Sequence, residues 1–161
     1  MIVDFHSLYE RYAQDVYRFA LYLCGDPALA EDIAAETFVR AWVAPGEIRL
    51  GTVKAYLFMI ARNLYRDGLK QAARHVELED SLPDPDPGPE AITSTRSELQ
   101  SVLTALQRLS EVDRAVLLMH LQEGMPYAEI AAALGLSVAA VKVKVHRARI
   151  ELHRRRDQER G

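Results

Sequence analysis

The sequence predicts an all-α protein made of two small helical domains joined by an acidic, proline-rich linker. Apolar residues recur every three or four positions on both sides of the middle of the chain, as they do on a helix with one buried face. No stretch alternates polar and apolar residues between turn signals, as a half-buried strand does. Four prolines and a glycine within residues 82–89 separate the two halves.

Three helices are expected in the first domain, residues 1–75. The first ends at Gly25, and Asp26 with Pro27 forms a helix start that opens a second helix running to about Val43. A loop follows over residues 44–51, and Thr52 can cap a third helix. The apolar stripes that define the first and third helices are Leu8, Tyr12, Val16, Phe19 and Leu23, and Leu57, Ile60, Ala61 and Leu64.

The linker is assigned to residues 76–97, where prolines exclude a regular helix or central strand and favour an extended chain. Its composition also explains the formal net charge of −3 over 161 residues. Residues 76–98 contain seven acidic side chains and one basic side chain, whereas Ser137–Gly161 contains eight basic and three acidic ones. Because binding depends on the local field, the negative total does not exclude a nucleic-acid partner.

Four helices are expected in the second domain, residues 98–161. The first carries an apolar stripe of Leu99, Val102, Leu103, Leu106 and Leu109. Ser110-Glu-Val-Asp113 has the form of a capping box, which predicts a helix from there to Glu123. A short helix over residues 126–134 and a final helix from Val138 to about Arg156 follow, with Gly135 and Ser137 between them.

A short helix, a turn containing glycine and a longer basic helix are typical of a helix-turn-helix or winged-helix-like DNA-binding unit. On the final helix one narrow arc is apolar, and we expect it to face the core: Val138, Val141, Val145, Ala148 and Leu152. The residues expected to face duplex DNA are Lys142, Val143, Lys144, His146, Arg147 and Arg149. The simpler alternative is a solvated basic face on a terminal helix.

Two patterns in the first domain also allow more than one interpretation. The second helix carries Asp32, Glu36 and Arg40 four residues apart and then Trp42, which fits either a solvated face with a core tryptophan or a protein-docking surface. The third helix carries a polar and basic row of Arg62, Asn63, Arg66 and Lys70, interleaved with Tyr56, Phe58 and Tyr65. Such aromatic rings stack on exposed bases in some proteins but are more often part of a core.

Three stretches, in this order and spacing, resemble the extracytoplasmic function (ECF) group of bacterial sigma factors, within the sigma-70 family. They are Ala30-Glu-Asp-Ile-Ala-Ala-Glu-Thr-Phe-Val-Arg-Ala-Trp42, Ala55-Tyr-Leu-Phe-Met-Ile-Ala-Arg-Asn-Leu-Tyr-Arg-Asp67, and Tyr127-Ala-Glu-Ile-Ala-Ala-Ala-Leu-Gly135 with Val141-Lys-Val-Lys-Val-His-Arg-Ala-Arg149. Together they span nearly the whole chain. Three positions depart from the common pattern: Ala35 replaces a frequent glutamine, and in Val141-Lys-Val-Lys144 the residues Val143 and Lys144 replace the serine and arginine of Val-Lys-Ser-Arg.

The resemblance implies a sigma region 2 bundle and a sigma region 4 domain, which bind core RNA polymerase and direct transcription initiation at promoter DNA. It assigns polymerase docking to Asp32, Glu36, Thr37, Phe38, Arg40 and Trp42. It assigns the single-stranded −10 element to Arg62, Asn63, Arg66 and Lys70, with the loop 44–53 helping to hold a flipped base. The residues of the final helix named above would contact the −35 element as duplex. An anti-sigma factor is a further partner that the resemblance implies.

Other functions find less support in the residues. One cysteine cannot form an internal disulfide or a cysteine-rich zinc site, and no catalytic residue, metal site or cofactor is expected. The five histidines are scattered, which argues against an enzyme. No apolar stretch approaches the ~18 residues that span a membrane, so a cytoplasmic protein without membrane insertion is expected. The remaining alternatives are a helix-turn-helix regulator that binds operator DNA by itself and a sigma-like protein limited to protein contacts.

Overall fold

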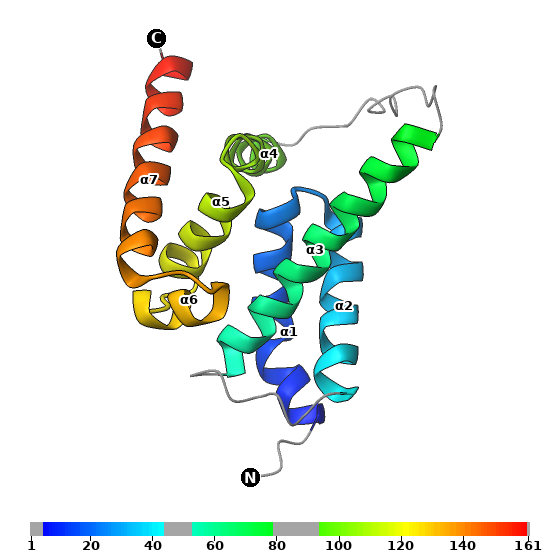
Figure 1. Ribbon diagram of the computed structural model, residues 1–161. Coiled ribbons are helices and arrows are strands. Elements are labelled where there is room, and N and C mark those ends of the chain that lie inside the picture. Colours follow the sequence, from blue (N-terminus) through cyan, green and yellow to red (C-terminus); the bar gives the residue numbers. More distant parts are fainter. Residues whose placement is uncertain (1–4, 44–52, 79–93, 161) are drawn as a thin grey trace.

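The computed structural model describes residues 5–43, 53–78 and 94–160, and these residues form helices joined by short turns (Figure 1). Within these ranges no strand occurs, and the prediction of an all-α protein is confirmed. The elements are α1 (Phe5–Cys24), α2 (Pro27–Val43), α3 (Val53–Leu78), α4 (Ser94–Gln107), α5 (Glu111–Leu117), the π-helix η2 (Leu118–Gln122), α6 (Tyr127–Leu134) and α7 (Val138–Arg160).

Helices α1, α2 and α3 pack against one another in the first half of the chain. Their core includes Phe19 and Phe58, whose rings stack with centroids 4.6 Å apart. Gly25 has the positive φ of +77° that ends α1, and the Asp26 carboxylate accepts a hydrogen bond of 3.0 Å from the backbone N–H of Ala28. The turn between α1 and α2 therefore has the chemistry that the sequence predicts.

Helix α4 buries a narrower stripe than the sequence predicts. Leu103, Leu106 and Leu109 are buried, but Leu99 and Val102 have 38% and 48% of their surface exposed. The prediction for these two residues is wrong because the first turns of α4 extend beyond the core. The capping box is confirmed in part, since the Ser110 hydroxyl accepts a hydrogen bond from the backbone N–H of Asp113 at 3.2 Å.

The helix that starts at Glu111 changes its winding before it ends. From Leu118 to Gln122 it is a π-helix, and the backbone N–H of Glu123 bonds to the carbonyl of Leu118 at 3.2 Å, five residues back. A π-turn contains one residue more than an α-helical hydrogen-bonded turn would, and local sequence patterns do not reveal it. Gly124, with a φ of +67°, then ends the segment.

Helices α6 and α7 form the predicted helix-turn-helix. Gly135 adopts the left-handed conformation at the end of α6, with φ +67°, and the Ser137 hydroxyl accepts a hydrogen bond of 3.0 Å from the N–H of Ala140. Val141, Val145 and Ala148 are buried as expected. Val138 is 41% exposed, so its assignment to the core was wrong: it is the first residue of α7 and no helix covers it fully.

The helices nearest the linker are longer than their apolar stripes. Helix α3 continues to Leu78 and α4 begins at Ser94, so both enter the predicted linker of residues 76–97. Helix α7 likewise continues past Arg156 to Arg160. The remaining linker residues, 79–93, and the loop over residues 44–52 lie outside the described ranges.

The two halves pack directly on each other. Helix α1 contacts α4, α5 and η2, and α3 contacts α6, so that buried apolar residues from both halves form one cluster. At the turn after α1, a Cβ atom added to Gly25 would come within 3.1 Å of the Gln107 side chain from α4. The two domains that the sequence predicts are thus in contact with each other.

Two glycines allow a test of these backbone arguments. We expect Gly25→Ala to destabilise the protein by about 1–2 kcal/mol, because the new methyl group meets Gln107 and because φ is positive. Gly68→Ala should instead stabilise it by about 0.5–1 kcal/mol, since Gly68 lies inside α3 with open space around it. Urea unfolding followed by circular dichroism measures both changes, and equal shifts in both variants would contradict the assignment.

Candidate functional site

The outer face of α2 exposes the pattern that the sequence singles out. Asp32, Glu36 and Arg40 are exposed, and Arg40 Nε lies 3.6 Å from a carboxylate oxygen of Glu36. Trp42 has 61% of its surface exposed, and its ring meets the edge of Phe5 with centroids 5.0 Å apart. An exposed tryptophan beside charged residues is typical of a protein-binding surface, and the core interpretation of Trp42 is excluded.

Two residues of the predicted docking set lie inside the bundle instead. Thr37 is fully buried, and its hydroxyl donates a hydrogen bond of 2.7 Å to the carbonyl of Ile33. Phe38 is 2% exposed and packs edge-on against Tyr9, with centroids 5.1 Å apart. In this conformation the two side chains hold α2 against its neighbours, and a partner reaches little of their surface.

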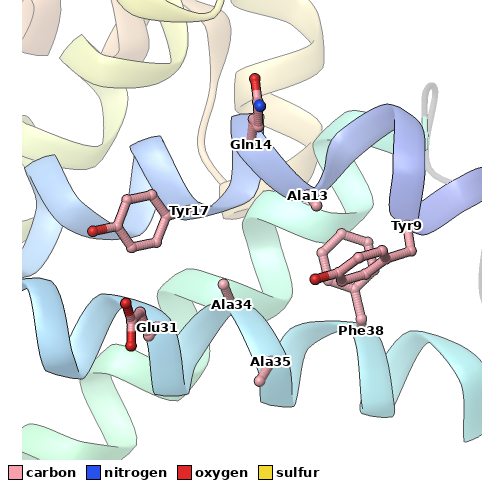
Figure 2. Close-up of a pocket in the computed structure, with 8 residues that line it drawn as sticks. All are labelled: Tyr9, Ala13, Gln14, Tyr17, Glu31, Ala34, Ala35 and Phe38. Carbon is pink, nitrogen blue, oxygen red and sulfur yellow. The ribbon is translucent and has the colours of Figure 1, made fainter.

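A groove of about 550 Å³ runs between α1 and α2 beside this face (Figure 2). Tyr9 lies over Phe38 at one end of the groove, and Tyr17 and Glu31 are at the other end. Small side chains form much of its wall, including Ala13, Ala34 and Ala35. The alanines of α2 and the tyrosines of α1 are the sequence signal for this groove, and the sequence analysis missed it.

The polar row of α3 is divided by the contact between the halves. Asn63, Arg66 and Lys70 are exposed. Arg62 is only 6% exposed, and its guanidinium donates to both carboxylate oxygens of Glu111 in α5, at 2.6 and 3.0 Å. Three members of the predicted −10 set are therefore accessible in this conformation, and the fourth is not.

The aromatic residues interleaved with that row belong to the core. Tyr56, Phe58 and Tyr65 are all less than a tenth exposed. The Tyr65 hydroxyl accepts a hydrogen bond of 3.1 Å from the guanidinium of Arg114, and burial raises the pKa of that hydroxyl. The base-stacking interpretation of these rings thus has no support in the structure.

A second hollow, of about 430 Å³, lies between α2 and α3. Its lining joins the exposed face of α2, through Glu36 and Arg40, to Asn63 of the α3 row. The loop predicted to hold a flipped base, residues 44–53, lies outside the described residues except for Val53. The hollow nevertheless connects the two candidate surfaces of the first half.

Helix α7 turns its basic side outward. Lys142, Val143, His146 and Arg149 are exposed, whereas Lys144 is partly buried. The Arg147 side chain is 58% exposed, yet its guanidinium donates to both oxygens of Asp113 in α5, at 2.9 and 2.8 Å. All six predicted −35 residues thus lie on one helix, and one of them is held in place by a neighbouring helix.

Asp113 is a residue that the sequence analysis recognised only as part of a helix cap. Burial alone would raise the pKa of its carboxyl, but hydrogen bonds from Arg147 and the charges of Arg147 and Lys144 outweigh burial and lower it. The same pair raises the pKa of Arg147. Asp113 therefore fixes α7 on α5 and orients the Arg147 guanidinium.

This pair predicts a pH-dependent contribution to stability. We expect Asp113→Asn to lower the free energy of unfolding by about 1 kcal/mol at neutral pH, because the charge-assisted hydrogen bonds are lost. A carboxyl whose folded pKa is depressed stabilises above its unfolded pKa of about 4, and the effect disappears as the pH falls through the folded pKa.

The difference between wild type and Asp113→Asn should therefore shrink below about pH 4. Urea unfolding between pH 7 and pH 2 measures it, and Asp67→Asn, at an exposed position of α3, controls for the change in net charge. A difference that stays constant down to pH 2 would argue against the ion pair.

Among residues 5–43, 53–78 and 94–160, no three His, Cys, Asp or Glu side chains gather as a potential metal site. In those ranges, no helix combines the length and apolar character needed to cross a bilayer.

Two family models match the two halves of the chain. The model of sigma-70 region 2 matches residues 8–75, and that of sigma-70 region 4 matches residues 99–152. The first match therefore contains α2 and most of α1 and α3, and the second contains α6 and most of α4 and α7.

Curated relatives extend the match over most of the chain. The ECF RNA polymerase sigma factor SigL of Mycobacterium tuberculosis is 36% identical over 87% of this chain and 81% of its own length. SigM of Bacillus subtilis is 32% identical over 94% of this chain and 93% of its own length. SigE of Mycolicibacterium smegmatis is 32% identical over 91% of this chain, which spans only 59% of that relative.

Two solved structures share the fold. The sigma factor RpoE in complex with the anti-sigma factor NepR, from Bartonella quintana, has a TM-score of 0.81 and 26% identity, covering 95% of this chain and 96% of that one. CnrH in complex with the cytosolic domain of CnrY has a TM-score of 0.72 and 28% identity, covering 96% and 88%. The region 2 and region 4 models match in order, and relatives named as ECF sigma factors match most of the chain. The chain therefore belongs to the ECF sigma factors of the sigma-70 family, which direct transcription initiation.

Proposed function

We propose that this chain binds core RNA polymerase through α2 and recognises promoters at two places, with α3 at the −10 element and α7 at the −35 element. One observation carries the proposal: helices α2 and α7, whose exposed residues differ in chemistry, lie on opposite sides of the molecule (Figure 1). The α2 surface has the exposed Trp42 among charges of both signs, whereas the α7 surface is basic. A protein partner suits the first surface, and DNA suits the second.

The docking surface consists of the exposed residues Asp32, Glu36, Arg40 and Trp42, next to the α1–α2 groove. Charged residues give this surface its orientation on the polymerase, and Trp42 contributes buried area when bound. Thr37 and Phe38 support the surface from below, and Phe38 forms part of the wall of the groove.

The two DNA contacts differ in kind. Helix α7 enters the major groove of the −35 duplex, where Lys142, Arg147 and Arg149 reach phosphates or base edges. Val143, 60% exposed, offers only a methyl contact, such as one with thymine, and Lys144 lacks the bidentate fork of an arginine. On α3, Asn63, Arg66 and Lys70 follow the separated strand of the −10 element.

Docking on the polymerase allows the two weak DNA contacts to act together. Each half offers a small DNA surface, and we expect neither to bind promoter DNA tightly by itself. Once docked, the two halves bind one DNA molecule at a high effective concentration. Capture of the unpaired strand by α3 then offsets part of the free energy of strand separation. Such a subunit acts in the cytoplasm, and the polymerase carries out the chemistry of transcription.

An anti-sigma factor is a second proposed partner. The solved RpoE is in complex with the anti-sigma factor NepR, and the solved CnrH is in complex with the cytosolic domain of CnrY. The likeness to RpoE extends over 95% of this chain, which includes both halves in their packed arrangement. A partner that binds this arrangement would keep the polymerase-binding and DNA-binding surfaces from acting together.

Run-off transcription with purified core polymerase on genomic fragments, followed by start-site mapping, tests the proposed function. We expect new transcripts whose start sites share two conserved upstream elements. A gel-shift assay with and without core polymerase separates the alternatives: an autonomous helix-turn-helix regulator binds duplex DNA without polymerase. A sigma-like protein limited to protein contacts would bind polymerase and yield no transcript.

Trp42→Ala should weaken binding to core polymerase roughly 30-fold, the loss typical of a central aromatic residue in a protein interface. Binding of the variant to core polymerase, measured by fluorescence anisotropy, gives this number. Val102→Ala, which shortens another exposed apolar residue on α4, is the matched control. Equal losses in the two variants would contradict docking through α2.

Arg147→Ala should weaken holoenzyme binding to −35 duplex DNA about tenfold, without changing affinity for core polymerase. Because the substitution also breaks the ion pair with Asp113, Asp113→Asn serves as the structural reference. Arg108→Ala, at an exposed arginine outside α7, controls for lost charge. If Asp113→Asn and Arg108→Ala reduce DNA binding as much as Arg147→Ala does, direct contact by Arg147 is ruled out.

A further inference from the structure

Charged side chains dominate the polar contacts between the two halves. The Glu123 side chain is completely buried, and it faces cations from two helices of the first half. Arg18 of α1 donates to both of its carboxylate oxygens, from Nε at 3.2 Å and from Nη2 at 3.0 Å. Lys54 Nζ of α3 lies 3.0 Å from the same carboxylate and donates to the backbone carbonyl of Glu123 at 3.4 Å.

A second carboxylate makes an equivalent contact at the other end of the same helical segment. Glu111 begins α5, and Glu123 directly follows η2. The pair of hydrogen bonds between Glu111 and Arg62 is bidentate, and the two side chains are only 18% and 8% exposed. The segment formed by α5 and η2 is therefore attached to the first half at both ends.

Two further hydrogen bonds cross the same contact. Gln107 of α4 donates to the carbonyl of Leu23 at 2.9 Å, near the end of α1. Arg114, buried in α5, donates to the Tyr65 hydroxyl of α3 as well as to the carbonyl of Leu109. These bonds fix the orientation of the second half on the first.

We propose that Glu111 and Glu123 form an acidic latch that closes the second half on the first and withholds Arg62 from DNA. The inference rests on the proposed function, in which Arg62 belongs to the α3 row that meets the −10 strand. A carboxylate and a phosphate both accept two parallel hydrogen bonds from a guanidinium. Glu111 thus occupies Arg62 in the same way that a DNA phosphate would.

The chemistry of the latch makes it reversible. A buried ion pair gains Coulomb energy but loses hydration, so it contributes little net stability compared with apolar packing. When the halves separate, both partners regain water, and Arg62 and Lys54 become available to nucleic acid. Binding to polymerase or to the DNA strand can therefore open the latch without disrupting the core of either half.

Small-angle X-ray scattering of the full chain tests whether the two acids hold the halves together. The wild type should have a radius of gyration near the value of about 15 Å expected for a compact chain of this length. The double variant Glu111→Gln/Glu123→Gln should exceed the wild type by roughly 3 Å or more, with unchanged helix content by circular dichroism. Glu98→Gln, at an exposed position of α4, is the matched control. A double variant that stays as compact as the wild type would overturn the latch.

Charge reversal provides a test that does not depend on removing a carboxylate. Arg62→Glu and Glu111→Arg should each expand the chain, because like charges then face each other across the contact. The combination of both substitutions restores an opposite-charge pair and should return the radius of gyration to the wild-type value. Failure of the combined variant to close again, while its helices remain folded, would count against the pairing.

Masking of Arg62 is measured with a short fluorescent single-stranded oligonucleotide. Without polymerase, Glu111→Gln should bind it about tenfold more tightly than Glu98→Gln, which has the same net charge. If scattering shows that the Glu111→Gln chain is open, and it still binds the oligonucleotide no more tightly than Glu98→Gln does, then Glu111 does not mask Arg62. Run-off transcription by wild-type protein is independent of these outcomes, so failure of the latch and failure of the proposed function can be told apart.

Discussion

Two carboxylates, that of the buried Glu123 and that of the partly buried Glu111, constrain how the halves of this protein fit together. A charge removed from water needs a partner close by, and among the described residues the ion-pair partners of these two belong to the opposite half. Arg18, Lys54 and Arg62 are therefore drawn to positions between the halves. The contact between the halves also brings α1 against α4, α5 and η2. Apolar residues of both halves are thereby buried in one shared cluster.

The distribution of accessible surfaces depends on this arrangement. The outer face of α2 and the basic face of α7 both remain open to solvent, because neither takes part in the contact between the halves. The polar row on α3 is affected differently, because Arg62 lies within the contact between the halves, whereas Arg66 and Lys70 lie outside it. The closed form thus leaves the proposed polymerase-docking and −35 surfaces exposed and withholds Arg62 of the proposed −10 row.

Local chemistry explains which parts of the structure could be predicted from the sequence. Helix starts at Asp26, Ser110 and Ser137 and the end at Gly135 follow from hydrogen bonds and dihedral angles within a few residues. The pairing of Arg62 with Glu111 joins positions 49 residues apart, and that of Arg18 with Glu123 joins positions 105 apart. Such partners depend on how helices pack, so the sequence identified Arg62 as a surface residue and gave no role to Glu111 or Glu123.

The π-helix η2 has a consequence for the direction of the recognition helix. Its wide turn acts as a one-residue insertion in a helix that would otherwise be regular. Excising that residue would rotate everything after it by about 100° around the helix axis. Glu123 would then turn away from Arg18, and α6 and α7 would swing with it. The length of one helical turn, down to a single residue, thus sets both the alignment of the two halves and the side of the molecule on which α7 presents its basic face.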